Sequence, residues 1–186
     1  MRCTMPVAGL LEQTVEIPGG VEVGLDGDAI VVSAKGTTLR RKLSHPRIQI
    51  VVQGKQAKIR CEYPRRREGA LVGTFAAHLR NMIVGVTEGY AYEMKIVYSH
   101  FPVKATVKGP EFIIENFLGE KFPRKTRIVG GTKVEVQGDQ VLLSGPDVEA
   151  VGQTAANIEL ATRIRGFDPR IFQDGIYITK KAGKEA

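Results

Sequence analysis

The feature that most constrains this chain is an internal duplication. The matching segments are Val52–Ile59 with Val136–Leu143 (offset 84 residues), Gly73–Leu79 with Gly152–Ile158 (offset 79) and Ile30–Val32 with Phe112–Ile114 (offset 82). A longer loop over residues 61–70 of the first copy accounts for the change in offset. A repeat of about 80 residues exceeds the roughly 20–50-residue unit of a solenoid and is long enough for a small domain with its own core. The chain is therefore predicted to contain two copies of one module.

The period of the apolar residues changes in the same order in both copies. Strand-like segments come first, at residues 21–23, 29–32, 38–43, 48–52 and 57–61, and again at 103–107, 112–117, 132–136 and 141–144. A stripe with helical spacing follows, formed by Leu71, Phe75, Leu79, Met82 and Val86 and then by Val148, Val151, Ala155 and Ile158. A strand follows each helix, at 90–97 and 176–178. This order predicts an α+β fold of two tandem repeats, each a mostly antiparallel sheet packed against one helix.

The pattern also suggests where the repeats begin and end. We expect an N-terminal arm over residues 1–15, a first repeat over 16–99, a second repeat over 100–179 and a basic tail over 180–186. Pro146 is expected to open the second helix, and Gly166 to end it. That length would place Arg163 and Arg165 in the last helical turn.

The chain is basic, with a net charge of +7 and a pI of about 9.5. Residues 1–100 hold 14 Lys and Arg against 9 Asp and Glu, and residues 101–186 hold 13 against 11, so both halves carry the excess. The basic residues are clustered, at 40–42, 65–67, 124–127, 163–165 and 180–184. Clustered positive charge favours a polyanionic partner, with nucleic acid ahead of an acidic membrane surface.

Composition argues against export and membrane insertion. Cys3 and Cys61 are too few for a disulfide framework or a zinc site. Reduced thiols in a cytoplasmic protein are the simplest interpretation. No apolar run approaches the roughly 20 residues that a membrane span needs, and the segment over 5–11 is a poor signal peptide.

The sequence offers no catalytic cluster. His45, His78 and His100 stand far apart, and no phosphate-loop, dinucleotide or nucleophile-elbow signature is present. Asp168 and Asp174 could form a general acid/base pair, but each precedes a residue typical of turns, Pro169 and Gly175. We therefore predict a protein with no catalytic residues, cofactor, metal or small-molecule substrate.

Some of the basic clusters have a structural explanation that does not require a polyanionic partner. Arg65, Arg66 and Arg67 would form either a solvated loop or a phosphate contact, since guanidinium groups match phosphate oxygens. Cations at 163 and 165 could instead complement the dipole of the second helix. The lysines of the tail have no evident structural role and favour a polyanion.

The densest functional signal lies between residues 163 and 177. It reads Arg-x-Arg-Gly-Phe-Asp-x-Arg-x-Phe-Gln-Asp-Gly-Ile-Tyr, in which basic, Gly-containing turns stand beside aromatic residues, as suits RNA. This stretch resembles the C-terminal signature of the ribosomal protein L6 family, in its archaeal and eukaryotic branch. Glu16-Ile17-Pro18 and Lys108-Gly109-Pro110 resemble the family as well. The resemblance covers roughly residues 15–181.

The resemblance implies two α+β repeats, no catalytic activity and a structural role in the cytoplasmic large ribosomal subunit. It implies binding to large-subunit rRNA, mainly by the second repeat, near the base of the side stalk. Neighbouring ribosomal proteins, and translation factors acting nearby, are the other expected partners. The rRNA contacts would fall on Arg163, Arg165, Arg170, Lys180 and Lys181, and less securely on Lys184 because the tail varies in the family.

A second hypothesis remains open on the residues alone. The duplication and exposed sheet faces also suit a cytoplasmic interaction module whose basic surface docks an acidic protein. A small hydrolase would need clustered acid and base residues, which the sequence does not provide.

Overall fold

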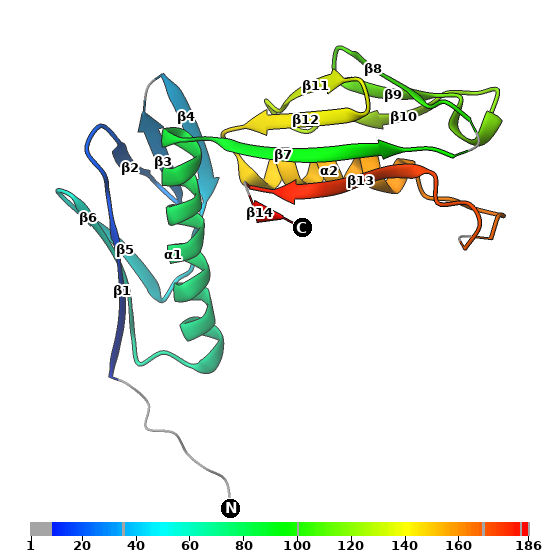
Figure 1. Ribbon diagram of the computed structural model, residues 1–186. Helices are drawn as coiled ribbons and strands as arrows, with labels where there is room; N and C mark the ends of the chain where they lie inside the picture. Colours follow the sequence, from blue (N-terminus) through cyan, green and yellow to red (C-terminus); the bar gives the residue numbers. More distant parts are fainter. Residues whose placement is uncertain (1–8, 35, 100, 169, 183, 186) are drawn as a thin grey trace, which may run out of the picture. The chain divides into compact units, whose positions relative to one another are not determined.

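The computed structural model describes residues 9–34, 36–99, 101–168, 170–182 and 184–185 (Figure 1). The chain divides into two compact units between Glu88 and Gly89. Within the described residues, each unit contains antiparallel sheets and one α-helix. The predicted α+β fold of two similar modules is confirmed.

The first unit packs two three-stranded sheets against a long helix. Its elements are β1 (Leu10–Glu16), β2 (Glu22–Asp26), β3 (Ala29–Ala34), β4 (Thr37–Lys42), β5 (Ile48–Gln53), β6 (Gln56–Glu62) and α1 (Arg66–Thr87). The sheet orders are β1-β6-β5 and β2-β3-β4, with every pairing antiparallel. Helix α1 contacts strands of both sheets.

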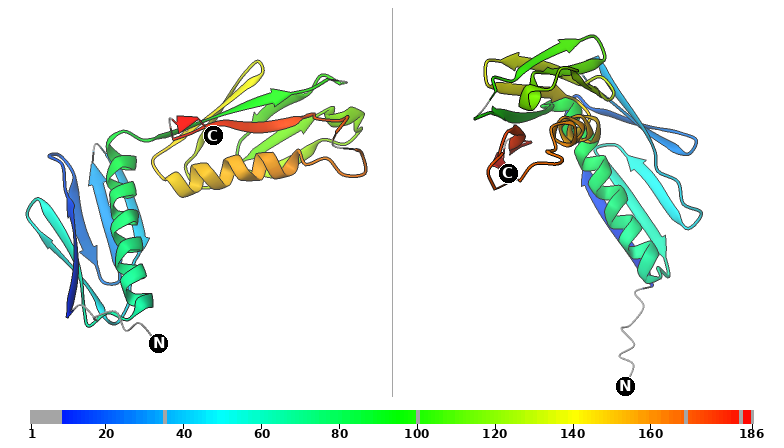
Figure 2. Two further views of the ribbon diagram at one scale, coloured as in Figure 1. Left: turned by 60° about the horizontal axis from the view of Figure 1, so that its bottom comes forward. Right: turned by 90° about the vertical axis from the view of Figure 1, so that its right-hand side faces the viewer.

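The second unit repeats this plan and adds strands after its helix. Its elements are β7 (Tyr90–Val97), β8 (Lys104–Lys108), β9 (Glu111–Glu115), the 3-10 helix η1 (Phe117–Gly119), β10 (Arg124–Arg127), β11 (Lys133–Gln137), β12 (Gln140–Gly145), α2 (Val148–Ala161), β13 (Gly175–Lys181) and β14 (Lys184–Glu185). The sheet orders are β10-β9-β8 and β11-β12-β7-β13-β14. Helix α2 lies along the sheet that contains β7 and β13 (Figure 2, left).

Strand β7 belongs to the second unit, which differs from the boundary expected at residue 99. It pairs antiparallel with β12 on one side and with β13 on the other. Its buried residues Tyr92, Met94 and Ile96 lie in the second core. In the first unit the equivalent partner of the last hairpin strand is β1, which pairs with β6. Each module therefore begins with this strand, and the second continues beyond its helix into β13 and β14.

Two described segments expected outside the repeats belong to strands. Residues 10–15, expected in an N-terminal arm, form β1, whose inward positions Leu11, Gln13 and Val15 alternate with exposed ones. At the other end, Lys180 and Lys181, expected in a tail, extend β13 and pair with β14. Main-chain pairing with a neighbouring strand explains both differences, because backbone hydrogen bonds hold a segment in a sheet even where its side chains are polar.

The duplication is visible in the turns. Gly54 and Gly138 occupy equivalent two-residue hairpin turns between β5 and β6 and between β11 and β12, with φ of 57° and 59°. Gly27 and Gly109 do the same in the earlier hairpins, at 58° and 59°. Glycine adopts this left-handed backbone conformation without the steric cost that a side chain brings.

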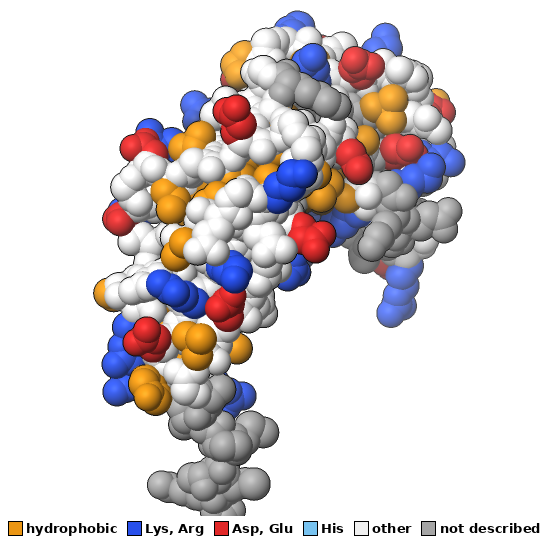
Figure 3. Space-filling model, turned by 90° about the vertical axis from the view of Figure 1, so that its left-hand side faces the viewer, with side chains coloured by type: hydrophobic (Ala, Val, Ile, Leu, Met, Phe, Trp, Pro, Cys, Tyr) orange, Lys and Arg blue, Asp and Glu red, His pale blue; other side chains and the backbone are white. Residues whose placement is uncertain are grey.

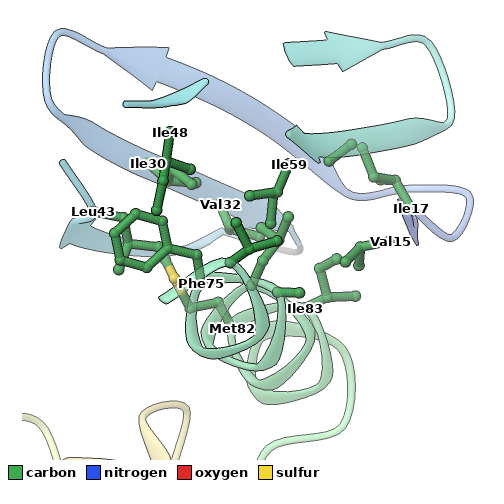
Figure 4. Close-up of a cluster of buried hydrophobic side chains, with 14 of the residues drawn as sticks. Val15, Ile17, Ile30, Val32, Leu43, Ile48, Ile59, Phe75, Met82 and Ile83 are labelled. Atoms are coloured by element: carbon green, nitrogen blue, oxygen red, sulfur yellow. The ribbon is translucent and has the colours of Figure 1, made fainter. Parts of the chain in front are cut away.

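The first core lies between α1 and the two sheets. Figure 4 shows Phe75, Met82 and Ile83 of the helix pointing toward strand residues such as Val32 and Ile59. By length and hydropathy α1 would also pass as a membrane span. Its buried face packs in this core, however, as in many water-soluble proteins. The apolar residues of α1 are therefore explained by its place in the core of the first unit.

The second core lies between α2 and the strands around β7. Its fully buried side chains include Phe112, Ile114, Leu143, Ile158 and Ile176. These residues come from β9, β12, α2 and β13, so the core joins strands before and after the helix. The end of α2 and the start of β13 are consequently held on a common support.

Candidate nucleic-acid interface

The candidate interface begins where α2 ends. The helix stops at Ala161, and Thr162 is buried just beyond it. The Thr162 hydroxyl donates to the carbonyl oxygen of Glu159 (3.0 Å) and accepts a hydrogen bond from the main-chain N–H of Ile176 (3.2 Å). This side chain links the end of α2 to the start of β13. Most of the 163–177 signature, whose residue types suit RNA binding, lies between these two points.

Arg124 on β10 holds the same helix end from another side. Its guanidinium donates to the carbonyl oxygens of Ala161 (2.8 Å) and Arg163 (3.1 Å). It also pairs with Glu120 and lies over the ring of Phe117, 4.3 Å from the ring centroid. The pairing lowers the pKa of the Glu120 carboxyl, since the hydrogen bond from Arg124 stabilises its charged form. Arg124 thus positions the end of α2 and the segment after it. Its place in the basic cluster at 124–127 did not indicate that role.

Arg163 and Arg165 lie after the helix, which corrects the expectation that they occupy its last turn. Thr162 already bonds the final carbonyls, and the chain turns away at this point. Both arginines line a shallow hollow together with Arg124, Lys125, Leu160 and Ala161. The helix-dipole alternative for these cations is therefore weakened.

Arg170 lies in a tight turn that Asp168 organises. The Asp168 carboxylate accepts from the main-chain N–H of Arg170 (2.9 Å), and its carbonyl accepts from Phe172 (3.0 Å). Asp174 is buried and accepts from the main-chain N–H of Ser99 (2.9 Å). Asp168 bonds a local main-chain group, as expected for a turn, whereas Asp174 bonds a distant segment and directly precedes β13.

The predicted cationic site residues differ in their surroundings. Within the described part of the chain, Arg163, Arg165 and Arg170 are exposed and form no ion pair. Lys180 pairs with Glu93 at 3.0 Å, so it has a structural partner that the tail interpretation missed. Lys181 is exposed at the end of β13, and Lys184 follows in β14. The three arginines and Lys181 are thus more available to a phosphate than Lys180.

Four described basic residues of the first unit form ion pairs with carboxylates. The ion pairs are Arg40–Asp26 (2.8 Å), Lys42–Asp28 (3.8 Å), Arg47–Glu68 (3.0 Å) and Lys58–Glu12 (3.5 Å). On the face drawn in Figure 3, Lys and Arg stand among Asp and Glu. Neutralised cations attract a polyanion less, so these four residues are weaker candidates for phosphate contacts than the unpaired arginines of the second unit.

Arg65, Arg66 and Arg67 begin α1 instead of lying within a loop. Arg65 is the N-cap, and its main-chain N–H donates to the Glu68 carboxylate at 2.7 Å. This bond, and to a smaller degree Arg47, lowers the pKa of Glu68 despite the opposing effect of burial. The carboxylate also offsets the unfavourable placement of cations at a helix N-terminus.

Among the described residues, no group of three His, Cys, Asp or Glu side chains is placed to hold a metal ion. Cys61 is a buried free thiol. His100 lies outside the described residues. The features that the described side chains offer to a partner are therefore charged groups and exposed surface.

Comparison with known proteins identifies the family. A family model described as ribosomal protein L6 matches residues 17–89 and 101–175. The chain belongs to the ribosomal protein L6 family. The two matched segments correspond to the two modules, so the predicted duplication is also a property of the family model.

Two similar proteins extend over nearly the whole chain. The large ribosomal subunit protein uL6 of Methanococcus vannielii is 48% identical over 180 residues, covering 97% of this chain and 99% of the relative. The uL6 protein of Methanosarcina mazei is 49% identical over 172 residues, covering 92% and 98%. The predicted family resemblance is confirmed, and with it the expectation of a structural ribosomal component in place of an enzyme.

Proposed function

We propose that this L6-family protein is a structural component of the large ribosomal subunit in the cytoplasm, and that it binds large-subunit rRNA through its second unit. The supporting observation is the group of exposed arginines at 163, 165 and 170, which have no ion-pair partner among the described residues. Arg124 and Thr162 hold the backbone that presents them. A rigid backbone carrying unpaired guanidinium groups suits a fixed set of phosphates.

The proposed mechanism is electrostatic anchoring combined with recognition of RNA shape. Each phosphate that a cation neutralises releases counterions, so affinity falls with rising salt. Lys180 and Lys181, at the end of β13, and Lys184, in β14, are the other residues proposed to contact rRNA. The finer placement, at the base of the side stalk beside the region where translation factors act, is supported by the family resemblance.

The test compares subunit incorporation of two double variants. Arg165→Ala with Arg170→Ala removes exposed guanidinium groups from the proposed interface. Arg40→Ala with Lys42→Ala removes the same charge from residues paired with Asp26 and Asp28. Tagged proteins are followed in sucrose gradients before and after a high-salt wash. We expect the first variant to be depleted from large subunits and the second to be retained.

Normal incorporation of the first variant, with unchanged rRNA affinity, would refute the assignment of the interface. A wild-type protein found only at the top of the gradient would favour the alternative, an interaction module for an acidic protein. The location near the stalk is tested separately by directed hydroxyl-radical probing from a probe attached at residue 165.

A further inference from the structure

A second hollow adjoins the basic one and has a different character. It lies between the end of α2 and the start of β13, with walls formed by Leu160, Ile164, Phe172 and Tyr177. Its remaining lining residues are Glu159, Thr162, Arg163 and Gln173. Arg163 lines both this hollow and the basic hollow that contains Arg165. Leu160 also lines both hollows, so an apolar surface meets a cationic one at these two residues.

The tyrosine wall of the hollow is held in place. A Cβ atom built on Gly175 would lie 2.9 Å from the Tyr177 ring, so the ring lies directly over the main chain at this glycine. The Tyr177 hydroxyl donates to the carbonyl oxygen of Gln173 at 3.3 Å. The side chain nevertheless remains 42% exposed. A ring that is already ordered loses little further conformational entropy when a ligand stacks on it.

The other apolar walls are exposed at Leu160 and half-buried at Ile164 and Phe172. Leu160 is 61% exposed on the last turn of α2. Phe172 is supported by Phe167, with ring centroids 4.9 Å apart. The described structure thus leaves an aromatic and aliphatic surface open beside several cations. Glu159 is the one carboxylate in the lining, and it faces the same hollow as Arg163.

We propose that this hollow receives an unstacked nucleobase of the rRNA, while Arg163 and Arg165 bind phosphates that flank it. The inference rests on the proposed rRNA binding and deepens it. Sequence-tolerant stacking on aromatic side chains is a common way to hold splayed-out bases. The cations beside the hollow favour RNA over an apolar protein segment, because only a ligand with both a flat apolar face and adjacent negative charge uses both surfaces.

The test separates stacking from charge by the salt dependence of binding. Affinity for the large-subunit rRNA of the same organism is measured over a series of salt concentrations for wild type, Tyr177→Leu, Tyr177→Phe and Arg163→Ala. We expect Tyr177→Leu to weaken binding about five- to 150-fold with the salt slope unchanged, as for loss of one stacked base. Tyr177→Phe keeps the ring and is expected to bind like wild type. Arg163→Ala should reduce the salt slope by about one.

Ultraviolet crosslinking with mass spectrometry gives an independent readout, because a stacked base should crosslink to Tyr177 or Phe172. Thermal melting of each variant confirms that it is folded. Unchanged rRNA affinity of Tyr177→Leu would overturn the inference. The salt slope of Arg163→Ala tests separately whether Arg163 contacts an rRNA phosphate. Unchanged rRNA affinity with lost subunit incorporation would assign the hollow to a protein neighbour and would also overturn it.

Discussion

The guanidinium of Arg124 donates a hydrogen bond of 2.8 Å to the main-chain carbonyl of Ala161, the last residue of α2. Strand β10 and the segment that carries Arg163 are thereby joined across 37 residues of sequence. The same guanidinium bonds the carbonyl of Arg163 and pairs with Glu120. A charged side chain therefore serves here to position other charged side chains.

Replacing Arg124 with Ala should destabilise the second unit and weaken rRNA binding. The variant loses two hydrogen bonds from a charged donor, which typically contribute about 1.5–3 kcal/mol each, although water replaces part of this at a side chain that is 22% exposed. We expect a net loss of about 2 kcal/mol in the free energy of unfolding. Urea denaturation measures it. Lys125→Ala, at the exposed neighbouring position, is the control and should change stability by less than about 0.5 kcal/mol.

Fragments of the chain should reveal where the second module begins. Residues 89–186 contain β7 between β12 and β13, whereas residues 100–186 lack it. Without β7 the fragment loses the buried side chains of Tyr92, Met94 and Ile96. We expect fragment 89–186 to fold cooperatively and fragment 100–186 to remain unfolded, as judged by circular dichroism and amide dispersion in NMR spectra. A folded fragment 100–186 would restore the boundary expected from the sequence.

The assignment of β7 to one of the two modules shows what the sequence alone could and could not predict. Periodicity located the strand over 90–97 correctly, because Tyr92, Met94 and Ile96 alternate with polar residues. It did not assign the partner strands, because alternation records only which face is buried. Pairing of β7 with β12 and β13 is a long-range property. The strand was therefore placed in the wrong module although its position along the chain was right.

The candidate site was predictable to a similar degree. The family resemblance pointed to Arg163, Arg165 and Arg170 as rRNA contacts, which remains a prediction, and the end of α2 was set too late because Gly166 resembled a helix terminator. The bonds of Thr162 to Glu159 and Ile176 end the helix earlier. The roles of Arg124 and of Lys180, which pairs with Glu93, depend on contacts between distant segments. Local sequence patterns do not indicate which distant segments come into contact.

The stabilising contribution of Glu68 should disappear in acid. Its pKa in the folded protein is lowered from the ordinary 4.5, chiefly by the hydrogen bond from the main-chain N–H of Arg65. A carboxyl group with a lowered pKa stabilises the fold at pH values above its unfolded pKa, and the effect is lost as the pH falls through the folded pKa. Glu68→Gln should thus be less stable than wild type near neutral pH, with a difference that shrinks below 4.5.

The measurement is the free energy of unfolding of both proteins over a pH series, followed by probes in α1. An NMR titration of the Glu68 carboxyl gives the pKa directly. Glu62→Gln on the exposed end of β6 is the matched control. A Glu68 pKa at or above 4.5 would contradict the role assigned to this carboxylate.

Two glycines of the duplication should be replaceable by alanine with a gain in stability. Gly73 and Gly152 lie inside α1 and α2, where an added Cβ would come no closer than 4.0 Å to Gln13 and 3.5 Å to Tyr92. Alanine in a helix interior is favoured over glycine by about 0.5–1 kcal/mol. Gly89→Ala is the contrasting variant, because its φ of 78° disfavours a side chain. Thermal melting should rank the first two above wild type and Gly89→Ala below it.

The ion pair between Lys180 and Glu93 should limit how strongly Lys180 attracts RNA. The two groups lie 3.0 Å apart, so a phosphate must compete with the carboxylate for the ammonium group. Glu93→Gln removes the competing charge at nearly constant shape, and we expect it to raise rRNA affinity at low salt and to steepen the salt dependence. Glu135→Gln, which removes the same charge from exposed β11, controls for net charge. Equal effects of the two variants would show that Lys180 makes no phosphate contact of its own.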